Sequence, residues 1–341
     1  MIYRNFRSKR FLFGVLYFVG IVVISYLITW FGKDLYTSKT IWIRDESGNV
    51  VGAAPFNPLT VPPLGTDRNG LNLFFQLLVG AKFTILFVFG ICVVQVFLGT
   101  VLGVILAHTP SIVQNLFQKI CKVYFFIPTV LWAILWIFPI MLHSELTGFN
   151  MEIIIKQFTV LCFALLPAVI LYVNQEINLF MKNEFVTTSK ILGASRFRII
   201  RKHIWLYLKE ILVVLFLQQF VQLFTLLIHL AFFGILIGGR GIDYDTRKPY
   251  SLTNEWAGLI GLYKNEFLAA PWIVIAPLLF FTVSIFVLHL MIKGIKKERG
   301  RGLYSMDKKK KNEPYEQGKE KKEIDKALFI QVSSKSIEKG S

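Results

Sequence analysis

Six stretches of this sequence are apolar over the length that a helix needs to cross a lipid bilayer. A membrane-spanning helix takes about 20 apolar residues. Of the 341 residues, 54% are hydrophobic and 17% are charged, and a soluble domain could not cover so much apolar surface. The sequence therefore predicts an all-α integral membrane protein with about six transmembrane helices. The six stretches lie approximately at residues 11–31, 83–107, 123–141, 158–173, 211–237 and 272–292.

The positive charges indicate which side of the membrane each connection faces. With the N-terminus inside, 28 of the 38 Lys and Arg residues fall on the inner side, whereas the acidic residues divide almost evenly. Because cytoplasmic loops are enriched in Lys and Arg, we expect a multi-pass protein of the cell membrane with both termini in the cytoplasm. Contacts with anionic lipid and partner proteins then explain the net charge of +17, and no nucleic-acid partner is expected.

The spans divide the chain into four regions. Residues 1–32 hold a cytoplasmic N-terminus and the first span, and residues 33–80 form an outer loop that several prolines interrupt. Residues 81–292 form a core with five spans. Residues 293–341 form a basic tail, in which alternating Glu and Lys predict a solvated segment.

Small residues and prolines predict how the core spans pack. Glycines in the second span allow a neighbouring helix to approach closely, and prolines should kink the third and fourth spans. Apolar residues at helical spacing over residues 71–78 predict a short interfacial helix before the second span. The glycines are Gly90, Gly99 and Gly103, and the prolines are Pro128 and Pro167.

A charged segment between two spans, residues 176–207, is the clearest functional feature. A helical run that includes Glu184 ends at Gly193, which fits a left-handed helix stop, and Ser195 could cap the next helix. That helix would carry an apolar face and a basic face. It could lie on anionic lipid or dock its apolar face into a groove on a soluble partner, and periodicity leaves both open. The apolar face holds Phe197 and Ile200, and the basic face holds Arg198 and Arg201.

Polar side chains within the spans are candidates for a transport path, because polar groups in lipid tend to face the bundle interior. Gln95 lies in the second span, and Gln218 and Gln222 share one face of the fifth, which also carries Gln219 and His229. The alternative is that these amides form hydrogen bonds between helices. His229 has no second ligand one turn away and the three cysteines lack metal-ligand spacing, so no metal or other cofactor is expected.

Three sequence motifs resemble the permeases of ABC importers, in the branch that carries oligopeptides, dipeptides and nickel. Leu192-Gly193-Ala194-Ser195, with the Arg198-Ile199-Ile200 that follows, is similar to the coupling loop of that branch. Residues 64–70 and 78–82 resemble the pattern LGTDxxGRD…YGAR before the second span. Residues 254–257 and 270–272 resemble PEWG…APW before the last span.

The resemblance implies a C-type permease subunit with the type I importer fold and a cytoplasmic coupling helix. Such a subunit pairs with a second permease, binds two ATPase subunits on the inside, and receives peptides or a similar small solute from an extracytoplasmic binding protein. The chain contains no Gly-x-x-x-x-Gly-Lys-Ser/Thr phosphate loop, so it is not expected to be an enzyme. The ATPase-coupling residues would be Glu184, Gly193, Ala194, Ser195, Phe197, Arg198, Ile200 and Arg201.

Two other functions stay open on the sequence. An ion-coupled secondary transporter would favour embedded carboxylates or internal repeats, and the six apolar stretches contain no Asp or Glu. A membrane-anchored assembly or regulatory relative without transport would explain the departures from the family pattern. The chain has Leu71-Asn72 where the family has Arg-Asp, Thr188-Ser189 for Ala-Ala, and Trp205-Leu206 for Leu-Pro.

Overall fold

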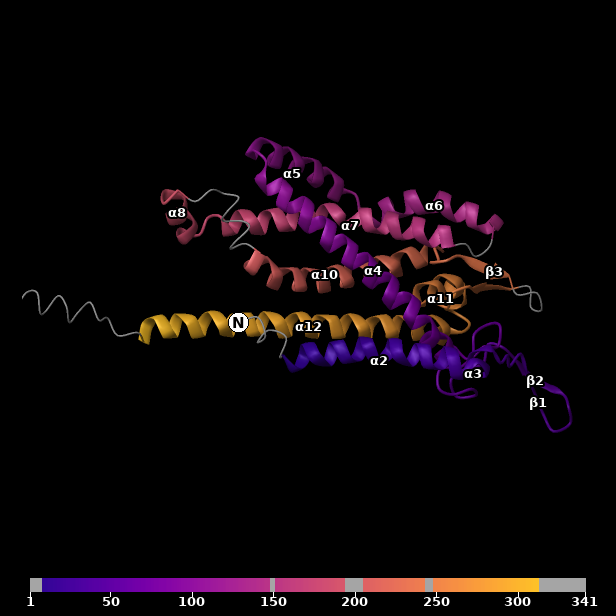
Figure 1. The fold of residues 1–341 in the computed structure, drawn as a ribbon. Coiled ribbons are helices and arrows are strands. Elements are labelled where there is room, and N and C mark those ends of the chain that lie inside the picture. Colours follow the sequence, from indigo (N-terminus) through magenta and orange to yellow (C-terminus); the bar gives the residue numbers. More distant parts are fainter. Residues whose placement is uncertain (1–7, 148–150, 194–204, 243–247, 313–341) are drawn as a thin grey trace, which may run out of the picture.

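The computed structural model describes residues 8–147, 151–193, 205–242 and 248–312. Within these ranges the chain forms long helices and two small antiparallel hairpins (Figure 1). The helices are α2 (Lys9–Phe31), α3 (Lys33–Thr37), α4 (Leu73–His108), α5 (Ser111–Phe126), α6 (Thr129–Thr147), α7 (Met151–Phe180), α8 (Glu184–Ile191), α10 (Trp205–Phe232), α11 (Trp256–Tyr263), the 3-10 helix η2 (Lys264–Glu266) and α12 (Pro271–Asn312). The strands are β1 (Trp42–Arg44), β2 (Val50–Ala53), β3 (Arg240–Ile242) and β4 (Pro249–Ser251).

Five of the described helices are long and apolar enough to cross a membrane, and the bent pair α5 and α6 makes a sixth candidate. The two helices of that pair meet at 77°, with Ile127 and Pro128 between them. Proline supplies no backbone N–H and disfavours helical geometry in the residue before it. The predicted break at Pro128 is therefore confirmed, and so is the prediction of an all-α membrane protein with about six spans.

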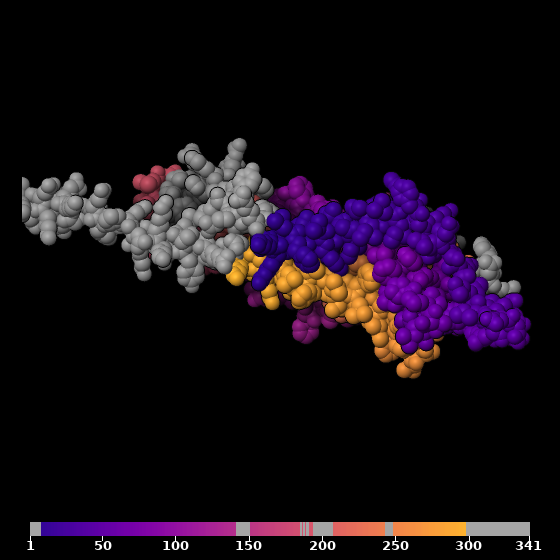
Figure 2. Space-filling model, turned by 90° about the horizontal axis from the view of Figure 1, so that it is seen from below, coloured from indigo at the N-terminus to yellow at the C-terminus, as the bar shows by residue number. Residues whose placement is uncertain are grey.

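Helix α4 packs along both α7 and α2 (Figure 1). A Cβ atom on Gly99 would lie 2.3 Å from Val169 Cγ1, and one on Gly103 would lie 2.8 Å from Val173 Cβ. The predicted close approach at these glycines is confirmed, and the neighbour that they admit is α7. On the other side of the bundle α2 lies beside α12, as Figures 1 and 2 both show.

The predicted interfacial helix over residues 71–78 is not a separate element. Helix α4 begins at Leu73, where the Asn72 side chain accepts a hydrogen bond from the Phe74 N–H at 3.1 Å. It then continues without interruption to His108. Extending an existing helix is easier than nucleating a second one, so the amphipathic turns join the span. Similarly, α12 continues past the predicted end of the last span, to Asn312.

The short helix α11 lies at the end of the bundle that carries the hairpins (Figure 1). Its apolar side chains belong to the main apolar core. Trp256, at its first position, is fully buried. Its ring packs against Phe281 of α12 at 5.4 Å and Phe224 of α10 at 6.3 Å between centroids. The Trp256 Nε1–H donates to the Leu77 carbonyl of α4 at 2.8 Å. This single residue therefore joins three spans.

Candidate functional site: a polar cleft and a coupling segment

A cleft of about 570 Å³ opens between α7, α10 and α12. Its polar residues come mainly from α10, on which Gln218 is half-buried and Gln222 is exposed. Two further exposed polar residues, Thr225 and His229, continue the face of Gln218 and Gln222 along α10. The cleft is lined by Ala168, Tyr172, Leu215, Gln218, Gln219, Val221, Gln222, His289, Ile292 and Lys296.

Hydrocarbon is a poor environment for this face of α10. Amide and imidazole groups in lipid are costly unless they find polar partners, so polar faces turn toward water-filled cavities or other subunits. Gln219 is 3% exposed, and within the described residues its Oε1 atom has no hydrogen-bond partner. The α10 face is therefore suited to a polar solute or a neighbouring subunit.

The cleft also contains residues that the sequence reading missed. His289 and Lys296 of α12 line it, and both are exposed. The spacing of seven residues indicates that the two side chains share a face of the helix. It does not predict which other helix that face contacts. Tyr172 of α7 carried no sequence signal beyond its place near the end of a predicted span.

Gln95 has a different environment from Gln218 and Gln222. It is fully buried between α4 and α7, where its Nε2 atom donates to the carbonyls of Leu161 and Cys162, each at 3.0 Å. The structure therefore does not place Gln95 at the cleft. These contacts match the alternative reading, in which a glutamine forms hydrogen bonds between helices.

The described part of the charged segment includes the short helix α8, which stops just before a glycine turn. Glu184 is exposed at the first position of α8, and Gly193 follows the helix with φ +87°. This is the left-handed geometry predicted for Gly193. Two apolar side chains before it, Ile191 and Leu192, are 81% and 83% exposed. The remaining predicted coupling residues, Ala194, Ser195, Phe197, Arg198, Ile200 and Arg201, lie outside the described residues.

Residues at the two ends of this segment connect α7 to α10. The hydroxyl group of Tyr207, near the start of α10, donates a hydrogen bond to Glu176 Oε2 of α7 at 3.0 Å. Its ring also packs on Phe180 of α7, with centroids 5.0 Å apart. Asn178 of α7 donates to Gln114 Oε1 of α5 at 2.9 Å. These contacts join α7 to α10 and to α5 at the ends of the charged segment.

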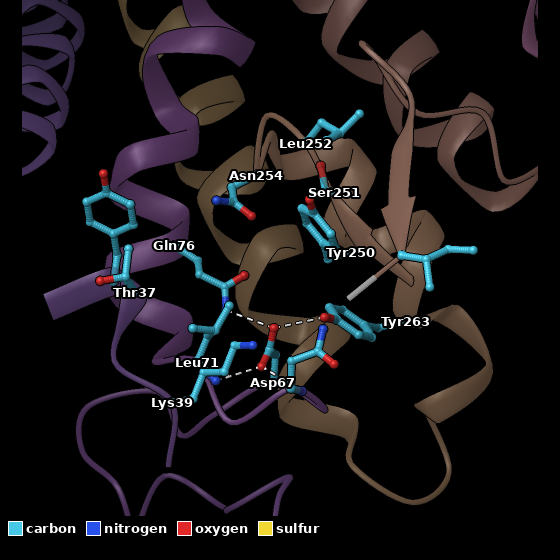
Figure 3. A pocket seen from close by; sticks show the side chains of 13 residues that line it. Thr37, Lys39, Asp67, Leu71, Gln76, Tyr250, Ser251, Leu252, Asn254 and Tyr263 are labelled. Atoms are coloured by element: carbon cyan, nitrogen blue, oxygen red, sulfur yellow. Dashed lines mark hydrogen bonds between the residues drawn. The ribbon is translucent and has the colours of Figure 1, made fainter. Parts of the chain in front are cut away.

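At the opposite end of the bundle, a polar pocket of about 480 Å³ contains the buried carboxylate of Asp67 (Figure 3). Its Oδ2 atom accepts hydrogen bonds from Gln76 Nε2 at 2.9 Å and the Tyr263 hydroxyl at 2.8 Å. Its Oδ1 atom accepts from the backbone N–H groups of Asn69 and Leu71. Burial raises the pKa of Asp67 above its usual value, although the hydrogen bonds oppose this shift. Asp67 therefore anchors the loop before α4 to α4 and α11.

A further set of contacts at this end joins α4 to the residues before α11. A Cβ atom on Gly80 would lie 1.7 Å from the Asn254 carbonyl oxygen, so the two backbones are in direct contact. The Trp256 N–H donates to Thr84 Oγ1 at 3.0 Å, and the Glu255 side chain caps α11. The two sequence motifs at this end, residues 64–82 and 254–257, thus pack against each other.

Among the described residues, no group of three or more His, Cys, Asp and Glu side chains has an arrangement that could hold a metal ion. Cys92, Cys121 and Cys162 are free and buried.

Residues 99–299 match the family described as "Binding-protein-dependent transport system inner membrane component". The chain is 22% identical over 296 residues to the oligopeptide transport system permease protein OppC of Haemophilus influenzae, which covers 86% of this chain and 85% of that protein. It is 22% identical over 233 residues to the di/tripeptide transport system permease protein DppC of Pseudomonas aeruginosa (68% and 70%). It is 21% identical over 299 residues to the glutathione transport system permease protein GsiD of Escherichia coli (86% and 87%).

The matched region contains every residue that lines the cleft and the whole charged segment. Because it covers more than half of the chain, and because the fold is a multi-pass bundle of apolar helices, the chain belongs to the family of inner membrane components of binding-protein-dependent transport systems.

Proposed function

We propose that this chain is the C-type permease subunit of an ATP-driven importer for peptides or a similarly small solute. It forms one half of the translocation path, and a second permease subunit forms the other half. Solute arrives from an extracytoplasmic binding protein, and two ATPase subunits bind on the inside. The polar cleft between α7, α10 and α12 carries the proposal, because it turns amides and a cation toward a shared space within the spans. The substrate class rests on the relatives, which are named for oligopeptides, di- and tripeptides and glutathione.

Both termini and residues 176–207 face the cytoplasm in this proposal, and the hairpins face outward. The distribution of Lys and Arg supports this orientation. The fold supports it too, because α8 and the last turns of α12 lie at one end of the bundle and the hairpins lie at the other (Figure 1). Residues 33–80 then form the outer loop and residues 293–341 the cytoplasmic tail.

Coupling acts through residues 176–207. Glu184 and the basic side chains Arg198 and Arg201 make polar contacts with the ATPase, and Phe197 and Ile200 provide the apolar anchor, with Gly193, Ala194 and Ser195 forming the turn. The exposed Ile191 and Leu192 add apolar surface beside this turn. When the ATPases close, the segment moves as a rigid body. The contacts of Tyr207 with Glu176 and Phe180 pass that motion to α7 and α10, which changes access to the cleft.

Purification of a tagged copy tests the subunit composition. Membranes solubilised with the full-length tagged chain are expected to yield a second permease and an ATPase. Recovery of this chain alone, or only with itself, would favour the membrane-anchored relative without transport.

Reversing the charges in the coupling segment is expected to weaken ATPase binding. The double change Arg198→Glu and Arg201→Glu should lower ATPase recovery several-fold, because a charge-assisted contact to a partner becomes repulsive. Arg240→Glu on the outer hairpin is the matched control and should leave recovery unchanged. Membrane insertion is measured in parallel and should be normal in all variants. Equal ATPase recovery from the double variant and the control would contradict the docking face.

Replacing glutamines in the cleft is expected to affect transport more than stability. Gln222→Leu and Gln218→Leu should lower uptake by reconstituted complex several-fold, because each removes a polar group from the path. Gln95→Leu is the comparison, since it removes two interhelical hydrogen bonds worth roughly 0.6 to 2 kcal/mol each. We expect it to lower thermal stability while leaving uptake per folded complex unchanged. The reverse pattern would place the path elsewhere.

A further inference from the structure

A second groove, separate from the polar cleft, runs between α2, α4 and α10 with α12 at its base. It has a volume of about 420 Å³, and its described lining is wholly apolar. The walls include Phe11, Val19 and Val22 of α2, Phe89 of α4, Phe216 of α10 and Met291 of α12. The helices α2 and α10 meet at Phe18 and Phe220, whose ring centroids are 5.6 Å apart.

The dimensions of the groove restrict what can fill it. Along α2 its wall runs from Phe11 to Val23, a rise of about 18 Å at 1.5 Å per residue. The hydrocarbon core of a bilayer is about 30 Å thick, so this length corresponds to roughly one leaflet. Dividing the volume by this length, and adding the radius of a water molecule at each wall, gives a groove roughly 8 Å across, whereas a helix with its side chains is about 10–12 Å in diameter. The groove therefore fits a hydrocarbon chain and is too narrow for another transmembrane helix.

Basic residues flank the end of the groove at the start of α2. Lys9 and Arg10 are exposed and directly precede Phe11. On α10, Lys209 stands one turn before Val213, which lines the groove. Positive charge at this level of a membrane protein attracts anionic lipid headgroups. The apolar groove, with positive charge at one end, therefore matches the arrangement of a phospholipid, in which an apolar acyl chain is joined to a negatively charged phosphate.

We propose that this groove binds one acyl chain of an anionic phospholipid from the leaflet at the N-terminal end of α2. The chain lies between Val19 of α2 and Phe216 of α10, and the phosphate lies near Lys9, Arg10 and Lys209. The surrounding medium supplies this occupant, since the groove belongs to membrane-spanning helices. An empty groove would leave its lining atoms without contact partners, at a cost in dispersion energy. The bound lipid holds α2 against the rest of the bundle.

Native mass spectrometry of the full tagged chain, purified with its partners, tests the site. The complex is incubated with phosphatidylglycerol and phosphatidylcholine that carry matched acyl chains, and retained lipid is counted. Val19→Trp fills the groove and should lower retained phosphatidylglycerol several-fold. Leu16→Trp is the control on the same helix, because Leu16 is 72% exposed and does not line the groove. Partner recovery shows whether each variant has folded. Equal lipid retention by a folded Val19→Trp variant and by Leu16→Trp would overturn the proposal.

Two further measurements separate the parts of the proposal. The double change Lys9→Gln and Arg10→Gln should lower the preference for phosphatidylglycerol several-fold while one lipid is still retained, and an unchanged preference would overturn the headgroup assignment. In intact membranes, Val19→Cys should be labelled by a thiol-reactive phospholipid. Crosslinking of Val19→Cys to a second polypeptide in place of lipid would show that a protein segment fills the groove, and would overturn the acyl-chain site.

Discussion

Gly80→Ala is expected to disrupt the end of the bundle that carries the hairpins and to lower the free energy of unfolding by about 3 kcal/mol or more, the upper end of the usual cost of overpacking. The added Cβ would lie 1.7 Å from the carbonyl oxygen and 2.5 Å from the carbonyl carbon of Asn254. Both are backbone atoms, so no side-chain rotation relieves the clash. Asn254 is itself held at φ +51° directly before the helix cap at Glu255, and α11 would have to move away from α4.

The matched control is Gly20→Ala, a second glycine inside a membrane-spanning helix. A Cβ atom on Gly20 meets nothing within 4 Å, and alanine favours a helix by up to about 1 kcal/mol over glycine. Thermal denaturation of the solubilised protein should therefore show a large fall in melting temperature for Gly80→Ala and none for Gly20→Ala. Similar melting temperatures for the two variants would show that α4 and the Asn254 backbone are not in contact.

The stability of the same end of the bundle is expected to fall as the pH rises from about 5 to about 8. Glu255 is fully buried, and burial raises its pKa from 4.5 to about 7, although the backbone N–H groups of Ile237, Ala257 and Gly258 oppose this shift. Between these two pKa values the folded state holds a proton that the unfolded state has released, so the free energy of unfolding decreases with pH. At about 1.4 kcal/mol per pKa unit, the loss amounts to about 3 kcal/mol. The contribution is complete below the unfolded pKa and is lost as the pH passes the folded pKa.

Glu255→Gln tests this pH dependence because glutamine resembles the protonated acid and does not titrate. Melting temperatures of the solubilised protein at pH 5, 6, 7 and 8 should decline for the wild type and stay nearly level for Glu255→Gln. Glu152→Gln is the control, since Glu152 is exposed and forms a surface ion pair with Lys156; it should keep the wild-type slope. A Glu255→Gln variant with that same slope would assign the pH dependence to another group, and the buried Asp67 would be the next candidate.

The periodic and compositional features of the chain were sufficient to predict much of the fold. Long apolar runs have one stable arrangement in lipid, a helix that satisfies its own backbone hydrogen bonds. The break at Pro128, the close approach at Gly99 and Gly103, and the left-handed geometry of Gly193 follow from local backbone and steric rules. Each of these is present in the structure. The helix predicted over residues 71–78 is present from Leu73 onward, but its local amphipathic pattern could not reveal that it continues into the span as one helix.

The candidate site was only partly predictable. Gln95, Gln218 and Gln222 carry the same side chain in similar apolar surroundings along the sequence. Only the packing of helices distant in sequence gives Gln95 two backbone carbonyls from α7 and leaves Gln222 exposed in a cleft. The same holds for His289 and Lys296, which reach the cleft because α12 lies against α10. Residues 194–204 of the coupling segment, and the contacts assigned to them, stay predictions.

The sequence by itself determined that this chain is a bundle of membrane spans, where those spans lie, and which family its motifs resemble, because chain-local hydrophobicity and backbone sterics control these properties. The tertiary structure decided which polar residues share the cleft, that two of the sequence motifs meet at Gly80 and Asn254, and that an apolar groove remains beside α2. These depend on contacts between residues far apart in the chain, and a helical period specifies a face without specifying its neighbour.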